Sequence, residues 1–178
     1  MRLRRATIAA ISAAVFSATG CNSDEREAVA NAPTETFDPC SIPADAIAAT
    51  GLNPEIFDNG WSDGINAGSW ERCLWESNGS ALPYFYEILA SSKHDIADLD
   101  SNSQYSDLAE IEVEGHTWLK YRFTPVDQHI QCGVALDTVA GIVTAEVSLQ
   151  NGPSLGQNPC QMVLDLTVEL AGNLPAQK

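Results

Sequence analysis

Two segments of the chain carry residue types at spacings that enzymes and metal sites use. Residues 60–64 read Gly-Trp-Ser-Asp-Gly and match the Gly-x-Ser-x-Gly pattern of a nucleophile elbow. In that motif a strained turn between a buried strand and a helix exposes the serine, here Ser62. Residues 57–59 lack the pattern of a buried strand and residues 64–68 lack a helix start. A glycine-rich loop is therefore the stronger interpretation, with a serine hydrolase using Ser62 as the alternative.

The second segment is acidic. Asp98, Asp100 and Asn102 fall at positions 1, 3 and 5 of an EF-hand calcium loop. However, Ser103 replaces the glycine of the sharp turn, and Ala109 stands where a bidentate glutamate is required. We therefore interpret this segment as a solvated acidic loop, with a weak calcium-binding surface protein as the alternative.

The three histidines give no independent signal for a catalytic base or a metal ligand. His94, His116 and His129 all follow Ser62, but no spacing connects them to it, and each is expected at the surface. Because no nucleophile, base and orienting group can be placed together, we expect a protein that is not an enzyme. We also expect no metal and no other cofactor.

Cys21 marks the end of a signal sequence. Three arginines and an apolar run over residues 6–16 precede it, and the segment Ala-Thr-Gly leads into it. This is the pattern of a lipoprotein signal peptide over residues 1–20, although alanine replaces the usual leucine of the lipobox. The apolar run is too short to remain as a membrane-spanning helix. We expect cleavage before Cys21 and a diacylglycerol anchor on it; a secreted protein with a free Cys21 thiol is the alternative.

The other four cysteines form an even set in a chain expected to be exported, which indicates two disulfides. They are Cys40, Cys73, Cys132 and Cys160. Spacing does not decide among the three possible pairings. We prefer Cys40 with Cys73 and Cys132 with Cys160, because these close loops of similar, moderate length. No Cys-x-x-Cys pair supports a zinc site.

Composition indicates one globular domain with acidic character. The 178 residues are 44% hydrophobic, and 24 acidic side chains against 9 basic ones give a net charge of −15. Loss of the three arginines with the signal peptide would take the charge to −18. A phosphate backbone would be repelled by this excess, so we expect no nucleic-acid partner.

The elements expected to carry these residues begin after a polar stretch. Residues 21–37 comprise the anchor and a flexible acidic tether, and the folded domain is expected over residues 38–178. Ser41 is expected to cap a short helix that ends at Gly51. Apolar runs at 72–76 and 83–90 around a Ser-Asn-Gly-Ser turn predict a hairpin. Alternating runs predict further strands at 109–113, 116–124, 131–137 and 140–149.

The last apolar segment, residues 158–172, fits two structures. Its apolar residues alternate as in a strand, whereas Asn158 and Pro159 resemble the start of a helix. The pattern of residues leaves both open.

The four tryptophans divide into two groups. Trp75 and Trp118 lie on predicted strands and are expected in the core. Trp61 and Trp70 lie in the loop that the first preferred disulfide would close, and they are possible contact residues for a partner.

Several short motifs are spread along the mature chain. They are Asp38-Pro39-Cys40-Ser41, Gly51-Leu52, Cys73-Leu74-Trp75, Glu114-Gly115-His116, Cys132 with Asp137, Asn158-Pro159-Cys160 and Leu174-Pro175. Together they resemble a family of actinobacterial envelope lipoproteins known as a domain of unknown function, DUF3558. The resemblance implies a lipid-anchored α+β domain with two disulfides and a helix after the final cysteine. The family has no assigned catalytic residues to carry over to this chain.

We therefore expect a single α+β domain with an antiparallel sheet of about five to six strands, a short N-terminal helix and a C-terminal helix. The expected function is a non-enzymatic binding or accessory module, lipid-anchored at the extracytoplasmic face of the cell membrane. Its expected partner is an envelope protein or an apolar small molecule. A purely structural or inhibitory surface protein is the remaining alternative.

Overall fold

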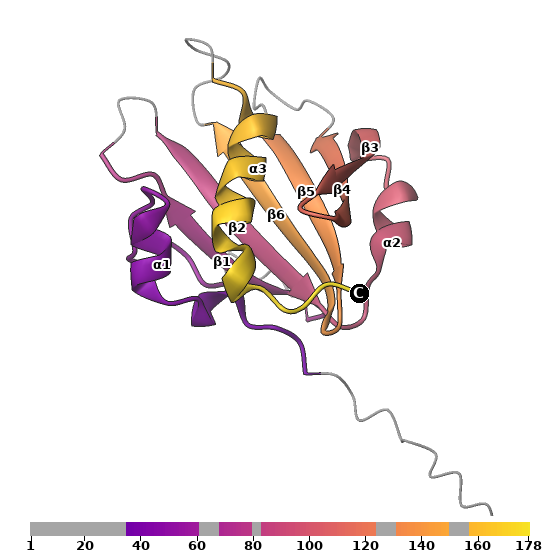
Figure 1. The fold of residues 1–178 in the computed structure, drawn as a ribbon, viewed down its shortest axis with the longest axis horizontal. Coiled ribbons are helices and arrows are strands. Elements are labelled where there is room, and N and C mark those ends of the chain that lie inside the picture. The colour runs from indigo at the N-terminus through magenta and orange to yellow at the C-terminus, as the bar shows by residue number, and fades with distance from the viewer. Residues whose placement is uncertain (1–34, 61–67, 80–82, 124–130, 150–156) are drawn as a thin grey trace, which may run out of the picture. The chain divides into compact units, whose positions relative to one another are not determined.

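The computed structural model describes residues 35–60, 68–79, 83–123, 131–149 and 157–178 (Figure 1). Six strands form one antiparallel sheet in the order β1-β2-β6-β5-β4-β3. The strands are β1 (Glu71–Glu76), β2 (Tyr84–Ser91), β3 (Tyr105–Val113), β4 (His116–Phe123), β5 (Gln131–Thr138) and β6 (Gly141–Leu149). The helices are α1 (Ala44–Ala49), α2 (Ile96–Asp100) and α3 (Pro159–Leu170), with single 3-10 turns at Pro39–Ser41 and Ala171–Asn173. The predicted α+β class and single domain are confirmed.

The strands predicted for the first hairpin and the four strands predicted after it are all present, but β3 is longer than the predicted range of 109–113. It begins at Tyr105, and its pairing with β4 shifts register between Ser106 and Ala109. Asp107 has a φ of 53° at this irregularity, a left-handed conformation that aspartate tolerates better than most residues. The bulge interrupts the alternation of apolar residues, which is why the first part of the strand does not show in the sequence.

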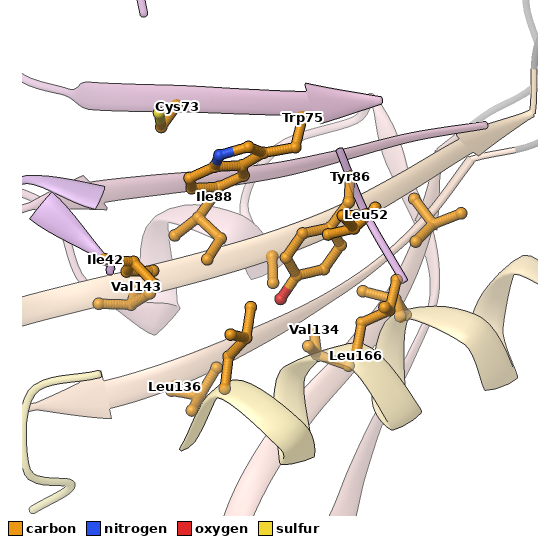
Figure 2. Close-up of a cluster of buried hydrophobic side chains, with 14 of the residues drawn as sticks. Ile42, Leu52, Cys73, Trp75, Tyr86, Ile88, Val134, Leu136, Val143 and Leu166 are labelled. Atoms are coloured by element: carbon orange, nitrogen blue, oxygen red, sulfur yellow. The ribbon is translucent and has the colours of Figure 1, made fainter. Parts of the chain in front are cut away.

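The main core lies between α3 and one face of the sheet. Val163, Leu166 and Leu170 form the helical stripe that packs against buried residues of the central strands. Figure 2 shows Tyr86 among these side chains with its hydroxyl directed toward α3, where it lies 3.0 Å from Thr167 Oγ1. Trp75 and Trp118 are 1% and 2% exposed, so their predicted place in the core is confirmed.

The C-terminal segment is a helix, as the family resemblance implies. Asn158 is the N-cap, and its side chain accepts hydrogen bonds from the backbone N–H groups of Cys160 and Gln161. Pro159 occupies the first turn, where no intrahelical donor is needed. The alternating pattern of this segment is therefore a by-product of a helix that is apolar on more than one side.

The N-terminal helix starts later than predicted. Ser41 does not cap it: α1 begins at Ala44 after Pro43, which offers no side-chain acceptor. Ser41 Oγ instead donates to Asp38 O within the preceding 3-10 turn. Phe37, expected at the end of the tether, packs against the main core. Among the described residues no helix is both long and apolar enough to cross a membrane.

Two disulfides join the elements, and their pairing is the preferred one. Cys40 is bonded to Cys73 and Cys132 to Cys160, across 33 and 28 residues of sequence. The first ties the N-terminal turn to the edge strand β1, and the second ties α3 to β5. Each link therefore holds a peripheral helix or turn on the sheet.

Replacing Cys132 and Cys160 together by alanine is expected to lower the free energy of unfolding by about 3 kcal/mol. The reason is that the open chain regains the conformational freedom that the closed loop removes from the unfolded state. Urea unfolding of the oxidised protein and the double variant would measure the loss. A difference below about 1 kcal/mol would contradict this role for the disulfide.

Candidate functional site

The face of the sheet opposite α3 carries a row of four residues that crosses β2, β6, β5 and β4. Glu87 is paired with Glu146, Glu146 with Gly133, and Gly133 with Tyr121. Directly paired residues project on the same side of a sheet. Their strand neighbours Ile88, Ala145 and Val134 point the other way, into the main core. The row thus places two carboxylic acids side by side in the middle of the sheet.

Glu146 is buried at the centre of this row. It is 6% exposed, Tyr121 Oη donates to its Oε1 at 2.8 Å, and Gln131 Nε2 donates to its Oε2 at 2.8 Å. Burial, reinforced by the negative charge of Glu87, raises the pKa of Glu146 to about 8. This carboxyl therefore changes its charge close to physiological pH, far above the usual range of a glutamate.

Gly133 makes the Tyr121–Glu146 hydrogen bond possible. A Cβ atom at residue 133 would lie 2.4 Å from Tyr121 Cζ and 2.6 Å from its Cε2, so the ring occupies the space that any other side chain would fill. The tyrosine lies across the glycine and reaches the carboxyl on the next strand. Burial and the neighbouring Glu146 raise the pKa of Tyr121 well above its usual value, so it remains a hydrogen-bond donor.

Arg72 supplies positive charge at the edge of the row. Its Nε bonds to Glu87, and its Nη1 bonds to Asp58 Oδ2 at 2.7 Å and to Gly60 O. The hydrogen bond from Arg72 lowers the pKa of Asp58. Among the described residues, the guanidinium bonds to the carboxylates of Glu87 and Asp58, whereas the side chains that donate to Glu146, Tyr121 and Gln131, are uncharged.

Aromatic rings flank the carboxyl pair. Tyr105 packs edge-on against Tyr121 and Phe123, with ring centroids 4.8 and 5.1 Å apart. Burial and the charges of Glu146 and Glu87 raise the pKa of Tyr105 to about 12. On the other side, Phe57 packs on Phe85 at 4.9 Å. We call this arrangement the Glu146 centre, and it consists of Glu146, Glu87, Arg72, Tyr121, Tyr105, Gln131, Phe85 and Phe57.

Phe57 is the exposed part of the Glu146 centre. It is 58% exposed, and its neighbour in sequence, Ile56, is 44% exposed. The ring of Phe57 reaches the row of carboxylic acids only through Phe85, which precedes Glu87 by two residues on β2 and lies on the same face. Neither Phe57 nor Ile56 stands out in the sequence, because both lie in a loop without a recognisable pattern.

Most of the candidates chosen from sequence lie elsewhere or outside the described residues. Cys21, Trp61, Ser62 and His129 belong to segments that the structure does not describe. Trp70 is half-buried, packs against a second apolar cluster and stacks on His94 with ring centroids 5.0 Å apart. Its role in contacting a partner stays a prediction.

The acidic segment is partly helical. Asp98 belongs to α2 and forms a capping box with Asp95, in which each side chain accepts from the other residue's backbone N–H. This carboxylate therefore serves the helix N-terminus and His94, to whose Nδ1 it lies at 2.9 Å. The described part of the chain holds no group of three His, Cys, Asp or Glu side chains arranged to bind a metal ion.

Two shallow grooves lie on the other side of the sheet, between α3 and the β3–β4 hairpin. One, of about 310 Å³, is lined by Val113, His116, Trp118, Leu174 and Gln177 among others. The other, of about 410 Å³, is lined by residues including Val113, Leu164, Val168 and Glu169. Gln177 Oε1 accepts from Trp118 Nε1 at 2.8 Å, so the C-terminal segment already satisfies the polar atom of that tryptophan. The ionisable side chains that line these grooves are exposed, so the grooves offer apolar contact without a buried ionisable group.

Two sequence features do mark the Glu146 centre in retrospect. Glu146 interrupts a strand that otherwise consists of apolar and small residues, and Gly133 lies in the interior of another strand. A glycine inside a strand often marks a close approach by another group. Neither feature says which side chain approaches, since that depends on the pairing of distant strands.

Comparison with known proteins identifies a family but no activity. A family model described as protein of unknown function (DUF3558) matches residues 12–173. No curated protein and no solved structure matches the chain.

Proposed function

We propose, for a chain that belongs to the DUF3558 family, an extracytoplasmic lipid-anchored module that binds an apolar small molecule bearing a polar group at the Glu146 centre. The polar group would meet the carboxyl of Glu146, and the apolar part would lie on the exposed ring of Phe57. The membrane anchor would be a lipid on Cys21.

The observation that carries this proposal is the burial of Glu146. Burying an ionisable carboxyl costs free energy, and an apolar residue at this position would serve the stability of the fold better. Strongly shifted ionisable groups gather at functional sites for this reason. The exposed Phe57, which belongs to this centre through its contact with Phe85, would give a ligand an apolar surface at the edge of the site.

Two features support the proposed location of the protein. The first 21 residues have the pattern of a lipoprotein signal sequence ending at Cys21. The two disulfides fit an oxidising compartment outside the cytoplasm. A lipid anchor on the outer face of the membrane would hold the domain where it meets molecules of the cell envelope.

Native mass spectrometry of the full chain, isolated gently from the cells that export it, tests this proposal. We expect a chain that starts at an acylated Cys21 and carries an additional mass that denaturation removes. An anchored chain without additional mass would contradict binding of a small molecule, and crosslinking to an envelope protein would then become the appropriate experiment.

Phe57→Ser is expected to abolish retention of that mass while lowering the melting temperature by no more than about 3 °C, because the ring is mostly in water. Val139→Ser is the matched control. Val139 is also 58% exposed, but it lies in the turn between β5 and β6 and is not part of the Glu146 centre. Equal loss of the mass in both variants, or in neither, would contradict the assignment of the ligand to this surface.

A further inference from the structure

A second polar arrangement lies apart from the Glu146 centre, where the start of β1 meets the turn before α2. Ser69 Oγ lies 2.9 Å from His94 Nε2, and His94 Nδ1 lies 2.9 Å from Asp98 Oδ2. The carboxylate accepts the Nδ1 proton, so the lone pair of Nε2 faces the serine hydroxyl. A hydroxyl, an imidazole and a carboxylate are therefore connected in the order that activates a serine nucleophile.

The surrounding structure holds these three side chains in place. Ser91 is fully buried, and its Oγ donates to Ser69 O at 2.5 Å and accepts from the backbone N–H groups of Lys93 and His94 at 3.1 and 3.3 Å. One hydroxyl thus ties the serine segment to the histidine segment. Trp70 stacks on the imidazole with the two ring planes 10° apart, which fixes the plane of the histidine.

The turn that carries His94 also has a rigid support. A Cβ atom at Gly141 would lie 2.1 Å from Ser91 O, so the backbone of β6 packs directly under this turn. The site nevertheless remains open to solvent, because the side chains of His94 and Asp98 are 34% and 56% exposed. Ser69 itself is partly exposed.

We propose that Ser69, His94 and Asp98 form a serine hydrolase site that acts on carboxylic esters. Ser69 Oγ adds to the ester carbonyl carbon as its proton passes to His94 Nε2. The bond to the leaving alcohol then breaks, and His94 Nε2 returns the proton to that oxygen. A water molecule attacks the resulting acyl-serine in the same way, releasing the carboxylic acid and restoring the Ser69 hydroxyl.

Two further features fit this chemistry. The hydrogen bond from His94 lowers the pKa of Asp98, which keeps the carboxylate charged to stabilise the imidazolium. Lys93 Nζ donates to Gly68 O at 3.4 Å, which places an ammonium group next to the residue that precedes Ser69. A cation in this position would stabilise the oxyanion that forms on the substrate.

This inference goes beyond the proposed binding function and does not depend on it. It also differs from the serine hydrolase that the Gly-x-Ser-x-Gly pattern left as the alternative, since the nucleophile is Ser69 and not Ser62. The contact between His94 and Ser69 arises from the fold, and no motif in the sequence predicts it.

The experiment is reaction of the full chain with a fluorophosphonate probe, followed by peptide mapping of the adduct, together with hydrolysis of p-nitrophenyl butyrate. We expect the adduct on Ser69 of the native chain. Ester hydrolysis should fall roughly 100-fold or more in Ser69→Ala and in His94→Gln. Two control variants should retain hydrolysis within about twofold: Ser92→Ala, an exposed serine of the same turn whose hydroxyl bonds to Thr36 Oγ1, and His116→Gln, an exposed histidine at the start of β4.

Asp98→Asn tests the orienting role of the carboxylate. It should lower kcat by roughly 100-fold or more with little change in KM, because it disturbs the tautomer of His94 and not substrate binding. The mapping is made on the native chain, so it remains decisive even if a variant folds poorly. An adduct on Ser62 or on another residue, no adduct at all, or hydrolysis by Ser69→Ala at the native rate would overturn the proposal. None of these results would affect the mass retained at the Glu146 centre, so the two proposals fail separately.

Discussion

Glu146→Gln is expected to make the protein more stable above about pH 7 while leaving its stability nearly unchanged at about pH 4. The pKa of Glu146 in the folded protein, about 8, lies above its value in the unfolded chain. Between these two values the folded state binds more protons than the unfolded state, so raising the pH lowers the stability of the native protein. Glutamine has the same shape and does not ionise, so the variant escapes this loss.

The size of the effect follows from the shift in pKa. One unit corresponds to about 1.4 kcal/mol, so by about pH 9 the native protein should be less stable than the variant by about 5 kcal/mol. Urea unfolding of both proteins across this pH range measures the difference. Glu110→Gln is the control, since Glu110 is an exposed glutamate on β3. Parallel stability curves for the native protein and Glu146→Gln would contradict a buried, ionisable Glu146.

Gly133→Ala is expected to have an effect of similar size in the opposite direction. The new Cβ atom would lie 2.4 Å from the ring of Tyr121, and that ring is confined by Tyr105 and by its own strand. Moving the ring would also break the hydrogen bond to Glu146 and leave the buried carboxyl with one donor fewer. Overpacking and the lost hydrogen bond together should cost about 4 kcal/mol, or a fall in melting temperature of roughly 12 °C.

Calorimetry of Gly133→Ala beside Gly172→Ala would isolate the effect of the clash. No atom lies within 4 Å of a Cβ built at Gly172, so alanine there should change the melting temperature by no more than about 2 °C. The double variant Gly133→Ala with Tyr121→Leu should lose less stability than the two single changes together, because they act on one contact. A harmless Gly133→Ala would show that Tyr121 does not depend on the glycine to reach Glu146.

Local patterns in the sequence were sufficient to predict most elements of the fold. The alternation of Trp118, Lys120 and Arg122 with Leu119, Tyr121 and Phe123 marks β4, and the polar turn between the runs at 72–76 and 83–90 marks the first hairpin. Both features depend on neighbours within a few residues. The helix α3 needed the family resemblance, because its apolar residues fit a strand and a helix equally well.

What could not be predicted depends on contacts between distant segments. Pairing of β2 with β6 joins the first hairpin to the later meander and brings Glu87 beside Glu146. No local pattern contains this pairing, and the Glu146 centre exists only because of it. The predicted start of α1 was wrong for a related reason. Ser41 has the residue type of a cap, but its hydroxyl donates to Asp38 O in the turn before the helix.

The arrangement of Ser69, His94 and Asp98 also combines a local contact with a contact between distant segments. His94 and Asp98 are four residues apart, a spacing that brings side chains together when the segment begins a helix. Ser69 comes from the turn that precedes β1, 25 residues away in sequence from His94. The sequence therefore presents a base and its orienting carboxylate but not the serine that they meet.

The most direct test of the Glu146 centre is the ¹³C chemical shift of the Glu146 side-chain carboxyl, followed from about pH 4 to about pH 10, with Glu146→Gln to assign the signal. The titration should be recorded before and after removal of any molecule that is isolated with the protein. A midpoint near 8 in the emptied protein, displaced when the molecule is bound, is the predicted result. A midpoint in the ordinary range of glutamate, or one that the bound molecule leaves unchanged, would contradict a ligand site built around this carboxyl.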